Sequence, residues 1–243
     1  GLERPRQSMN ILVHFNEELN NPQKPTLFMV HPGGGGVEAY VRLVQKLEKS
    51  FNCIGLDNYN VLHPGGDLGQ TLEDLTELYL REMMSYFRDC VPRNLWILGW
   101  SLGGKIGMEL AVRLGELGLS SVHVVMLDTF NDDPYSIANM QFACRSDLEQ
   151  KELAINRARN SKPGSRCVKV TLFKAGKAPG ATPLTEYELK ERFRYNGYDD
   201  YKEWVDIVPL DQADHQTIMH EQYIDRICTF LLSAGETFQS ENK

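Results

Sequence analysis

The chain has 243 residues, 42% of them hydrophobic and 24% charged, which suits a globular domain and excludes a disordered or fibrous chain. A net charge of −7 without a basic stripe argues against a nucleic-acid partner, and no apolar run approaches the roughly 18 residues of a transmembrane helix. The five cysteines are scattered, none of them paired at metal-ligand spacing, and no secretion signal is evident. We therefore expect reduced thiols, no metal site and a cytoplasmic protein.

Seven apolar runs of strand length alternate with helical patterns along the chain. The predicted strands cover residues 11–15, 26–31, 52–57, 95–100, 123–127, 167–173 and 205–210. Predicted helices cover residues 38–49, 71–87, a segment after residue 101, and 215–232; the second opens with a capping signature at Thr71 and Asp74. Several strands are continuously apolar, as expected of parallel strands covered on both faces. The alternation predicts one doubly wound α/β domain with right-handed crossovers.

Residues 131–166 interrupt this alternation with an insertion. It contains a weak helical pattern at residues 146–160, whose apolar positions are few. We expect this segment to lie over the domain rather than within it. Insertions after strand ends often form lids over binding sites, and a solvated surface helix is the equally weighted alternative.

The segment from Gly99 to Gly103 matches the pattern G-x-S-x-G, with Ser101 at its centre. An apolar strand precedes it and an amphipathic helix follows. A serine on such a tight turn adopts a strained backbone, and glycines two positions on either side avoid a collision there. The turn would lift the Ser101 hydroxyl above the carboxyl ends of the strands, at the N-terminus of a helix. Ser101 is therefore the predicted nucleophile.

A serine nucleophile needs a base and an acid that orients this base. In folds that place the serine on such a turn, the order along the chain is serine, acid, histidine. Asp128 ends the next strand, and His215 follows the last strand, so both are expected on the same rim as Ser101. These two residues complete the predicted triad. Weaker rivals are His14, His31, His63, His123 and His220 for the base, and Asp132, Asp133, Asp206, Asp211 and Asp214 for the acid.

Acyl transfer also requires two donors to a developing oxyanion. The Leu102 N–H, directly after the nucleophile, is the first predicted donor. The second should come from the glycine loop after the strand at residues 26–31, where Gly34 is our choice and Gly33 or Gly35 would fit with a shift of one position.

The same loop supports a rival hypothesis. Residues 34–39 match the dinucleotide-binding pattern G-x-G-x-x-G/A between a strand and a helix, and Asp57 follows about 20 residues later. However, Pro32 stands in the turn and removes a donor, and another strand precedes this one. The rival also leaves Ser101, Asp128 and His215 unexplained, so we rank it low.

Taken together, "TLFMVHPGGGGVEAYVRLVQKL", "LWILGWSLGGKIGMELA", "VVMLDTF" and "DQADHQTIM" resemble the thioesterase domain of nonribosomal peptide synthetases and polyketide synthases. The resemblance runs in order from about Ile11 to Leu232. It implies an α/β-hydrolase fold, a mostly parallel sheet with helices on both faces and a short lid insertion. It also implies that Ser101 accepts the acyl chain, that Asp128 and His215 are its acid and base, and that Gly34 and Leu102 are the oxyanion donors.

The implied partner is an upstream carrier domain, whose phosphopantetheine arm delivers an acyl or peptidyl thioester. The enzyme itself would need no metal or redox cofactor. Release by hydrolysis or by macrocyclisation stays open. So do a stand-alone editing (type II) thioesterase, a carboxylesterase and a catalytically silent relative that only binds. We expect residues 1–243 to form a single domain, cut from the C-terminal end of a larger synthetase. Ala213 departs from the glycine that the family often has before its D-H pair.

Overall fold

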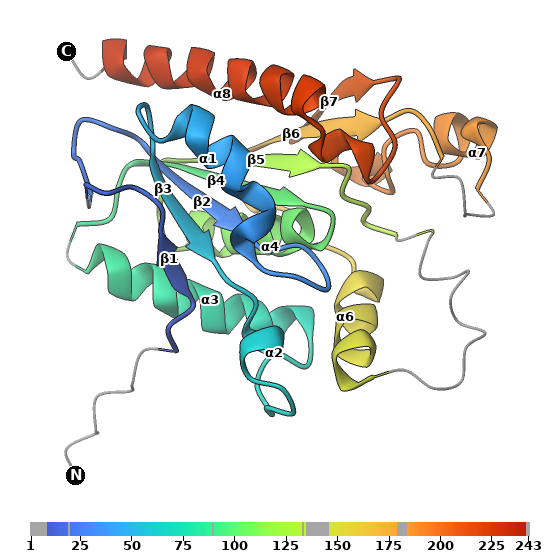
Figure 1. Ribbon diagram of the computed structural model, residues 1–243, viewed down its shortest axis with the longest axis horizontal. Coiled ribbons are helices and arrows are strands. Elements are labelled where there is room, and N and C mark those ends of the chain that lie inside the picture. The colour runs from blue at the N-terminus through green and yellow to red at the C-terminus, as the bar shows by residue number, and fades with distance from the viewer. Residues whose placement is uncertain are drawn as a thin grey trace.

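The computed structural model describes residues 9–18, 20–88, 90–132, 134, 146–178 and 184–241, and it contains a seven-stranded sheet with helices on both faces (Figure 1). The strand order is β1-β3-β2-β4-β5-β6-β7, in which β1 pairs antiparallel with β3 and all other pairs are parallel. The predicted mostly parallel α/β sheet is therefore confirmed, and the strand bounds differ from the expected ones by at most two residues. The strands are β1 (Leu12–His14), β2 (Thr26–Val30), β3 (Asn52–Leu56), β4 (Asn94–Trp100), β5 (Ser121–Leu127), β6 (Val168–Ala175) and β7 (Val205–Leu210).

Helices form a layer on each face of the sheet. One layer contains α1 (Val41–Leu47), which follows the 3-10 turn η1 (Val37–Tyr40), and the long C-terminal helix α8 (Glu221–Glu241). The other layer contains α3 (Leu72–Phe87) and α4 (Leu102–Glu116). The shorter elements are α2 (Tyr59–Leu62), α6 (Asp147–Arg157), α7 (Glu186–Glu191), η2 (Asp199–Tyr201) and η3 (Thr217–Met219).

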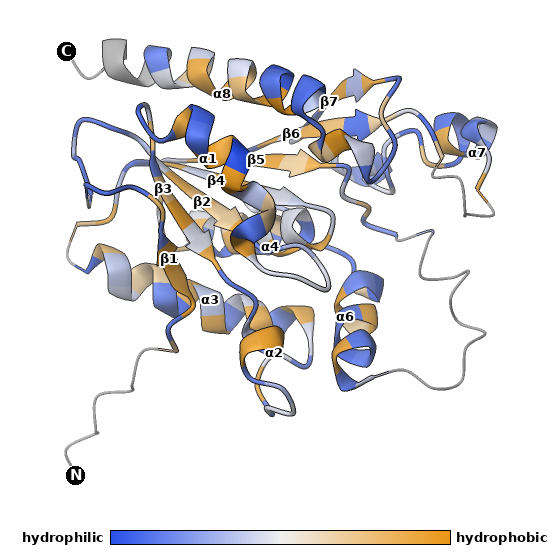
Figure 2. Ribbon diagram, in the orientation of Figure 1, coloured by the Kyte–Doolittle hydropathy of each residue, from blue (hydrophilic) through white to orange (hydrophobic). Residues whose placement is uncertain are grey.

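The core is divided into two halves by the sheet. Along β2, Leu27 and Met29 belong to the cluster under α1 and α8, whereas Phe28 and Val30 belong to the cluster under α3 and α4. Successive strand side chains point to opposite faces, so a strand buried on both faces is apolar throughout. Figure 2 shows this pattern as mainly orange strands between helices striped in orange and blue. Each fully buried aliphatic side chain of this kind contributes roughly 1.5–3 kcal/mol to folding.

Local sequence signals set several element ends. The Thr71 hydroxyl accepts a hydrogen bond from the Asp74 N–H at 3.1 Å, so the predicted N-cap of α3 is confirmed. The predicted last helix, in contrast, begins later than expected. Asp214 Oδ1 accepts from the N–H groups of Gln216 (2.8 Å) and Thr217 (2.7 Å), a turn that competes with helix formation. His215 consequently lies in a loop, and α8 starts at Glu221.

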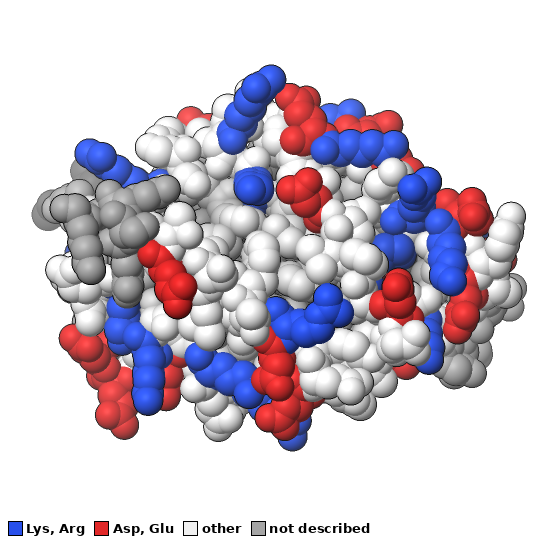
Figure 3. Space-filling model, turned by 90° about the horizontal axis from the view of Figure 1, so that it is seen from above, with Lys and Arg blue, Asp and Glu red and all other residues white. Residues whose placement is uncertain are grey.

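Charged side chains of both signs are interspersed on the face seen from the side of α8 (Figure 3). None of the helices in the described ranges is both long enough and apolar enough to cross a bilayer.

His31, one of the rival histidines, is buried behind the glycine loop. Only 1% of it is exposed, and its ring nitrogens pair with the Tyr79 hydroxyl (2.7 Å) and the Pro32 carbonyl (2.8 Å). Burial lowers the pKa of His31 from 6.5 to about 4. The unfolded chain therefore binds a proton at this residue between pH 6.5 and 4 and the folded chain does not, so stability falls as the pH is lowered through this window.

We expect a His31→Gln variant to lose less stability on acidification than the unmodified protein. The difference in unfolding free energy between the two proteins should shrink by about 2 kcal/mol between pH 7 and pH 4.5, as urea titrations would measure. His220→Gln is the matched control, because His220 is exposed. A difference that stays constant with pH would show that His31 titrates normally in the fold.

Candidate active site

Ser101 lies at the sharp turn between β4 and α4. Its backbone has φ 53° and ψ −119°, a conformation that side-chain-bearing residues rarely adopt. The Ser101 N–H donates to the Leu127 carbonyl at 2.9 Å, and the Ser101 carbonyl accepts from the Thr129 hydroxyl at 2.8 Å. These bonds tie the turn to the end of β5, where Asp128 follows.

The glycines around Ser101 are required by close backbone contacts. A Cβ atom at Gly99 would lie 2.1 Å from the Gly103 carbonyl carbon, and one at Gly103 would lie 2.3 Å from the Val30 oxygen. A Cβ at Gly104 would lie 1.9 Å from the Thr129 hydroxyl oxygen. The steric reason that the sequence suggested for the pattern therefore agrees with the geometry.

Three predicted residues, Ser101, His215 and Asp128, form one chain of hydrogen bonds at the carboxyl ends of the strands. His215 Nε2 lies 3.0 Å from Ser101 Oγ, and His215 Nδ1 lies 2.7 Å from Asp128 Oδ2. The Trp100 indole donates to the His215 carbonyl at 3.0 Å. This bond holds the loop that carries His215 against the turn at Ser101, which we call the elbow. With Nδ1 bonded to a carboxylate, Nε2 of a neutral ring is free to accept the serine proton.

Asp128 is buried, and its second oxygen is also bound. Asp128 Oδ1 accepts from the Ala175 N–H at 3.1 Å and from the Asn196 amide at 3.2 Å. The Lys174 ammonium donates to Asn196 Oδ1 at 2.8 Å, which fixes the orientation of that amide. Burial lowers the pKa of Lys174, and the Asp128 carboxylate partly opposes this shift.

Asn196 should therefore act as a positioning residue for the acid. It has φ 50°, so Asn196→Gly removes the side chain without adding backbone strain. We expect about a tenfold loss of kcat with little change in KM, because a hydrogen bond to a charged group is lost. Asn20→Gly is the control, since Asn20 is exposed and has φ 53°. Equal kcat values for the two variants would rule out the positioning role.

The rival acids occupy other places. Asp132 pairs with Arg159, Asp214 caps the turn after itself, and Asp206 lies at the amino end of β7. Asp211 follows the end of β7, against Gly176. Asp133 lies outside the described residues.

The two predicted oxyanion donors belong to the start of α4 and to the glycine loop after β2. Leu102 is the first residue of α4, where N–H groups have no partner within the helix. The Gly34 N–H donates to Glu152 Oε1 at 2.7 Å, an acceptor from α6 that the sequence did not predict. Gly35 is fixed by its carbonyl, which accepts from the Asn58 amide at 2.9 Å. The expected donor at Gly34 is thus engaged by a carboxylate of the protein itself.

The glycine loop offers little support for the dinucleotide hypothesis. Asp57 Oδ1 accepts from the N–H groups of Val37 (3.2 Å) and Asn58 (3.0 Å), so this carboxylate fastens the loop. A Cβ atom at Gly36 would lie 2.4 Å from the same oxygen. Packing within the protein therefore accounts for the spacing between the glycines and Asp57.

The inserted helix α6 is more firmly docked than its composition suggested. Ile155 is fully buried in the core cluster of α3 and α4, and only 4% of Lys151 is exposed. The buried Lys105 ammonium, from α4, donates to the carbonyls of Asn131 (2.9 Å), Asn156 and Ala158 (2.8 Å). The C-terminal end of α6 is therefore fixed to α4, the helix that follows Ser101. Residues 133 and 135–145 of the insertion lie outside the described residues.

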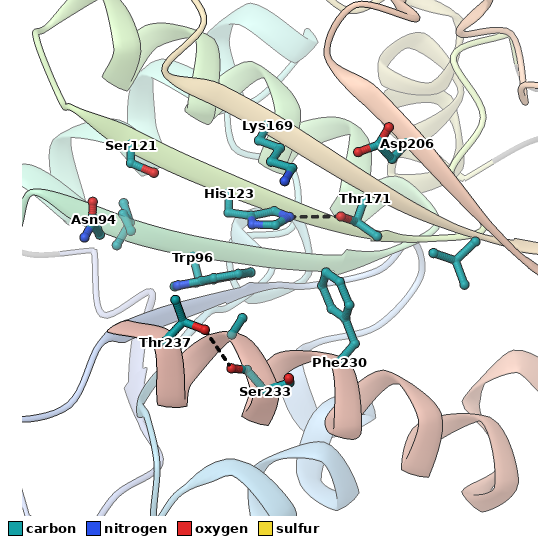
Figure 4. Close-up of a pocket in the computed structure, with 13 residues that line it drawn as sticks. Asn94, Trp96, Ser121, His123, Lys169, Thr171, Asp206, Phe230, Ser233 and Thr237 are labelled. Atoms are coloured by element: carbon teal, nitrogen blue, oxygen red, sulfur yellow. Dashed lines mark hydrogen bonds between the residues drawn. The ribbon is translucent and has the colours of Figure 1, made fainter. Parts of the chain in front are cut away.

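A groove of about 610 Å³ lies between α8 and the amino ends of β4–β7, away from Ser101 (Figure 4). There the His123 ring stacks on Trp96 with centroids 4.1 Å apart, and its Nε2 lies 2.9 Å from the Thr171 hydroxyl. Burial lowers the pKa of His123 to about 4. His123 is thus a packing residue at the opposite end of the strands, and we place no chemistry in this groove.

Comparison with known proteins gives consistent results. A family model for the thioesterase domain matches residues 25–163, more than half of the chain. N-(5-amino-5-carboxypentanoyl)-L-cysteinyl-D-valine synthase of Penicillium rubens is 28% identical over 88% of this chain, which spans 6% of that protein. Enterobactin synthase component F of Escherichia coli is 29% identical over 56% of the chain, which spans 10% of it.

Solved structures share the fold. The NocB thioesterase domain, in covalent complex with a fluorophosphonate nocardicin G analogue, superimposes with a TM-score of 0.63 at 17% identity, covering 92% of this chain and 99% of that one. The type II thioesterase BorB, from the borrelidin biosynthetic cluster, gives 0.62 at 12% identity, covering 96% and 100%. The predicted α/β-hydrolase fold and the resemblance to synthetase thioesterase domains are confirmed, and the chain belongs to the thioesterase domain family.

Proposed function

We propose that the protein is a serine thioesterase that receives an acyl or peptidyl chain on Ser101 and then releases it. The observation that carries this proposal is the hydrogen-bonded series Ser101–His215–Asp128, at distances of 3.0 and 2.7 Å, in a chain of the thioesterase domain family. The relatives that are peptide synthetases suggest a substrate held as a thioester on the phosphopantetheine of a carrier domain.

The first half-reaction forms the acyl-enzyme. His215 Nε2 takes the Ser101 proton while Oγ bonds to the thioester carbonyl carbon, and the electron pair of the C=O bond moves to oxygen. The N–H groups of Leu102 and Gly34 would stabilise this oxyanion. When the tetrahedral intermediate collapses, the C–S bond breaks and the thiol leaves with the proton from His215.

The second half-reaction returns the enzyme to its initial state. His215 deprotonates water, or an amine or hydroxyl of the acyl chain itself, and this nucleophile attacks the ester carbonyl. The proton then passes to Ser101 Oγ as the C–O bond breaks. Water yields an acid, and an internal nucleophile yields a lactam or lactone, so the balance depends on how well the site excludes water.

The test is intact-protein mass spectrometry followed by peptide mapping, after incubation with a fluorophosphonate and, separately, with a short acyl thioester. Labelling of Ser101 by both reagents would support the proposal. The absence of a label on folded protein would instead favour a catalytically silent relative.

A stand-alone editing role is the second candidate, because the type II thioesterase BorB aligns over 96% of this chain. Rates with short acyl-carrier and peptidyl-carrier thioesters distinguish the two roles. Preference for short, aberrant acyl groups would favour editing, and preference for the peptidyl chain would favour release of a finished product.

A further inference from the structure

Glu152 links the inserted helix α6 to the glycine loop. Its Oε1 atom accepts from the Gly34 N–H at 2.7 Å, across 118 residues of sequence. A hydrogen bond to an ionised carboxylate is about twice as strong as one between neutral groups. The N–H that the proposed mechanism assigns to the oxyanion is therefore already engaged by a strong acceptor.

The second carboxylate oxygen of Glu152 lies beside Gly33, which also faces the Leu102 side chain. A Cβ atom built on Gly33 would lie 3.3 Å from Glu152 Oε2 and 3.7 Å from Leu102 Cδ2. Any oxygen that reached the Gly34 N–H would meet the carboxylate oxygen already there. Two negative oxygens at hydrogen-bond distance from one donor repel each other, so the carboxylate and an oxyanion exclude one another.

The helix that carries Glu152 is held in place independently. Ile155 is fully buried, and Lys105 fixes the carbonyls of Asn156 and Ala158 at the C-terminal end of α6. On the adjacent turn, the Lys151 ammonium donates to the Gly66 carbonyl at 2.7 Å. Glu152 itself is only half-buried, so rotation about its side-chain bonds can move the carboxylate to solvent while α6 stays docked.

We propose that Glu152 is a gate of the oxyanion hole. Its carboxylate binds the Gly34 N–H in the resting protein, and an acyl oxygen binds this N–H only after the Glu152 side chain has rotated away. This inference rests on the proposed function, because it needs Gly34 as an oxyanion donor. The resting enzyme is then autoinhibited by one side chain, and the gate opens without movement of the inserted helix.

The test compares the second-order rate of fluorophosphonate labelling at Ser101 between variants, since the phosphoryl oxygen of the reagent must occupy the oxyanion hole. We expect Glu152→Ala to react about tenfold faster than the unmodified protein, because no charged acceptor has to be displaced. Glu152→Gln, which keeps the shape but has a weaker neutral acceptor, should be accelerated less. Glu149→Ala is the matched control, an exposed carboxylate on the same helix, and should leave the rate unchanged.

Hydrogen–deuterium exchange of residues 31–36 provides a second measurement that does not depend on activity. Glu152→Ala should increase exchange at the Gly34 amide, whereas Glu149→Ala should not. Labelling of Ser101 at an equal or lower rate in Glu152→Ala would overturn the gate, and so would unchanged exchange at Gly34. If neither the unmodified protein nor Glu152→Ala is labelled at Ser101 while exchange at Gly34 does increase in Glu152→Ala, the contact between Glu152 and Gly34 stands and the proposed function fails instead.

Discussion

Ser101→Ala is expected to lower kcat/KM for a thioester by about 10⁵-fold or more, and to abolish covalent labelling by a fluorophosphonate. The variant keeps His215 and Asp128 but has no atom that can bond to the acyl carbon. Loss of the nucleophile in a triad of this kind removes almost all of the rate enhancement, leaving what binding and the oxyanion hole supply. Steady-state kinetics and intact mass measure both effects.

The fold of this variant should be preserved. Ser101 is only partly buried, and its backbone hydrogen bonds to Leu127 and Thr129 do not involve the Ser101 hydroxyl. We expect a melting temperature within about 2 °C of the unmodified protein. Ser121→Ala is the control, since Ser121 is exposed at the amino end of β5 and should keep full activity. Substantial activity in Ser101→Ala would assign the nucleophile to another residue.

The parts of the site that the sequence predicts are those set by local backbone geometry. The elbow requires glycines at fixed offsets from Ser101, and the contacts at Gly99 and Gly103 show why no larger residue fits. Apolar strands place Ser101 and Asp128 at adjacent strand ends, because β4 and β5 are parallel neighbours in register. The positions of strands and elbow therefore follow from short stretches of sequence.

The supporting residues could not be predicted in the same way, because they depend on distant pairings. Lys174 stands in an apolar strand, where its charge has no partner until the chain from Asn196 packs beside it. Lys105 lies in a helix that is buried on nearly all sides, and its ammonium finds carbonyls some 26 to 53 residues away. A lysine within an otherwise apolar segment signals a buried charge, but it does not identify the partner.

Glu152 shows the same limit for the inserted helix. The few apolar positions of α6 suggested a helix lying on the surface, yet Ile155 is buried in the core and Lys105 bonds to the carbonyls of Asn156 and Ala158. The short helices α2 and α7 were also not predicted, since four to six residues are too few to show a helical period. The sequence therefore does not predict the side chains that support and position the candidate site through distant contacts.

Asp128→Asn should lower kcat by about 10⁴-fold while leaving the protein folded. The carboxylate accepts a hydrogen bond from His215 Nδ1 at 2.7 Å, which requires the proton of a neutral ring to be on Nδ1. An asparagine that turned its amide towards His215 would donate instead, and the ring proton would move to Nε2. In that tautomer the ring cannot accept the Ser101 proton, although all heavy atoms keep their places.

Asp214→Asn is the matched control, because Asp214 directly precedes His215 and bonds to the N–H groups of Gln216 and Thr217. It should retain activity within a few-fold. The two variants separate the candidates for the acid, since whichever residue orients the imidazole shows the larger loss. Because a wrong tautomer impairs proton transfer more than binding, the Asp128→Asn loss should appear in kcat rather than in KM, and labelling of Ser101 should slow in parallel. Near-normal turnover in Asp128→Asn with a large loss in Asp214→Asn would transfer the acid role to Asp214.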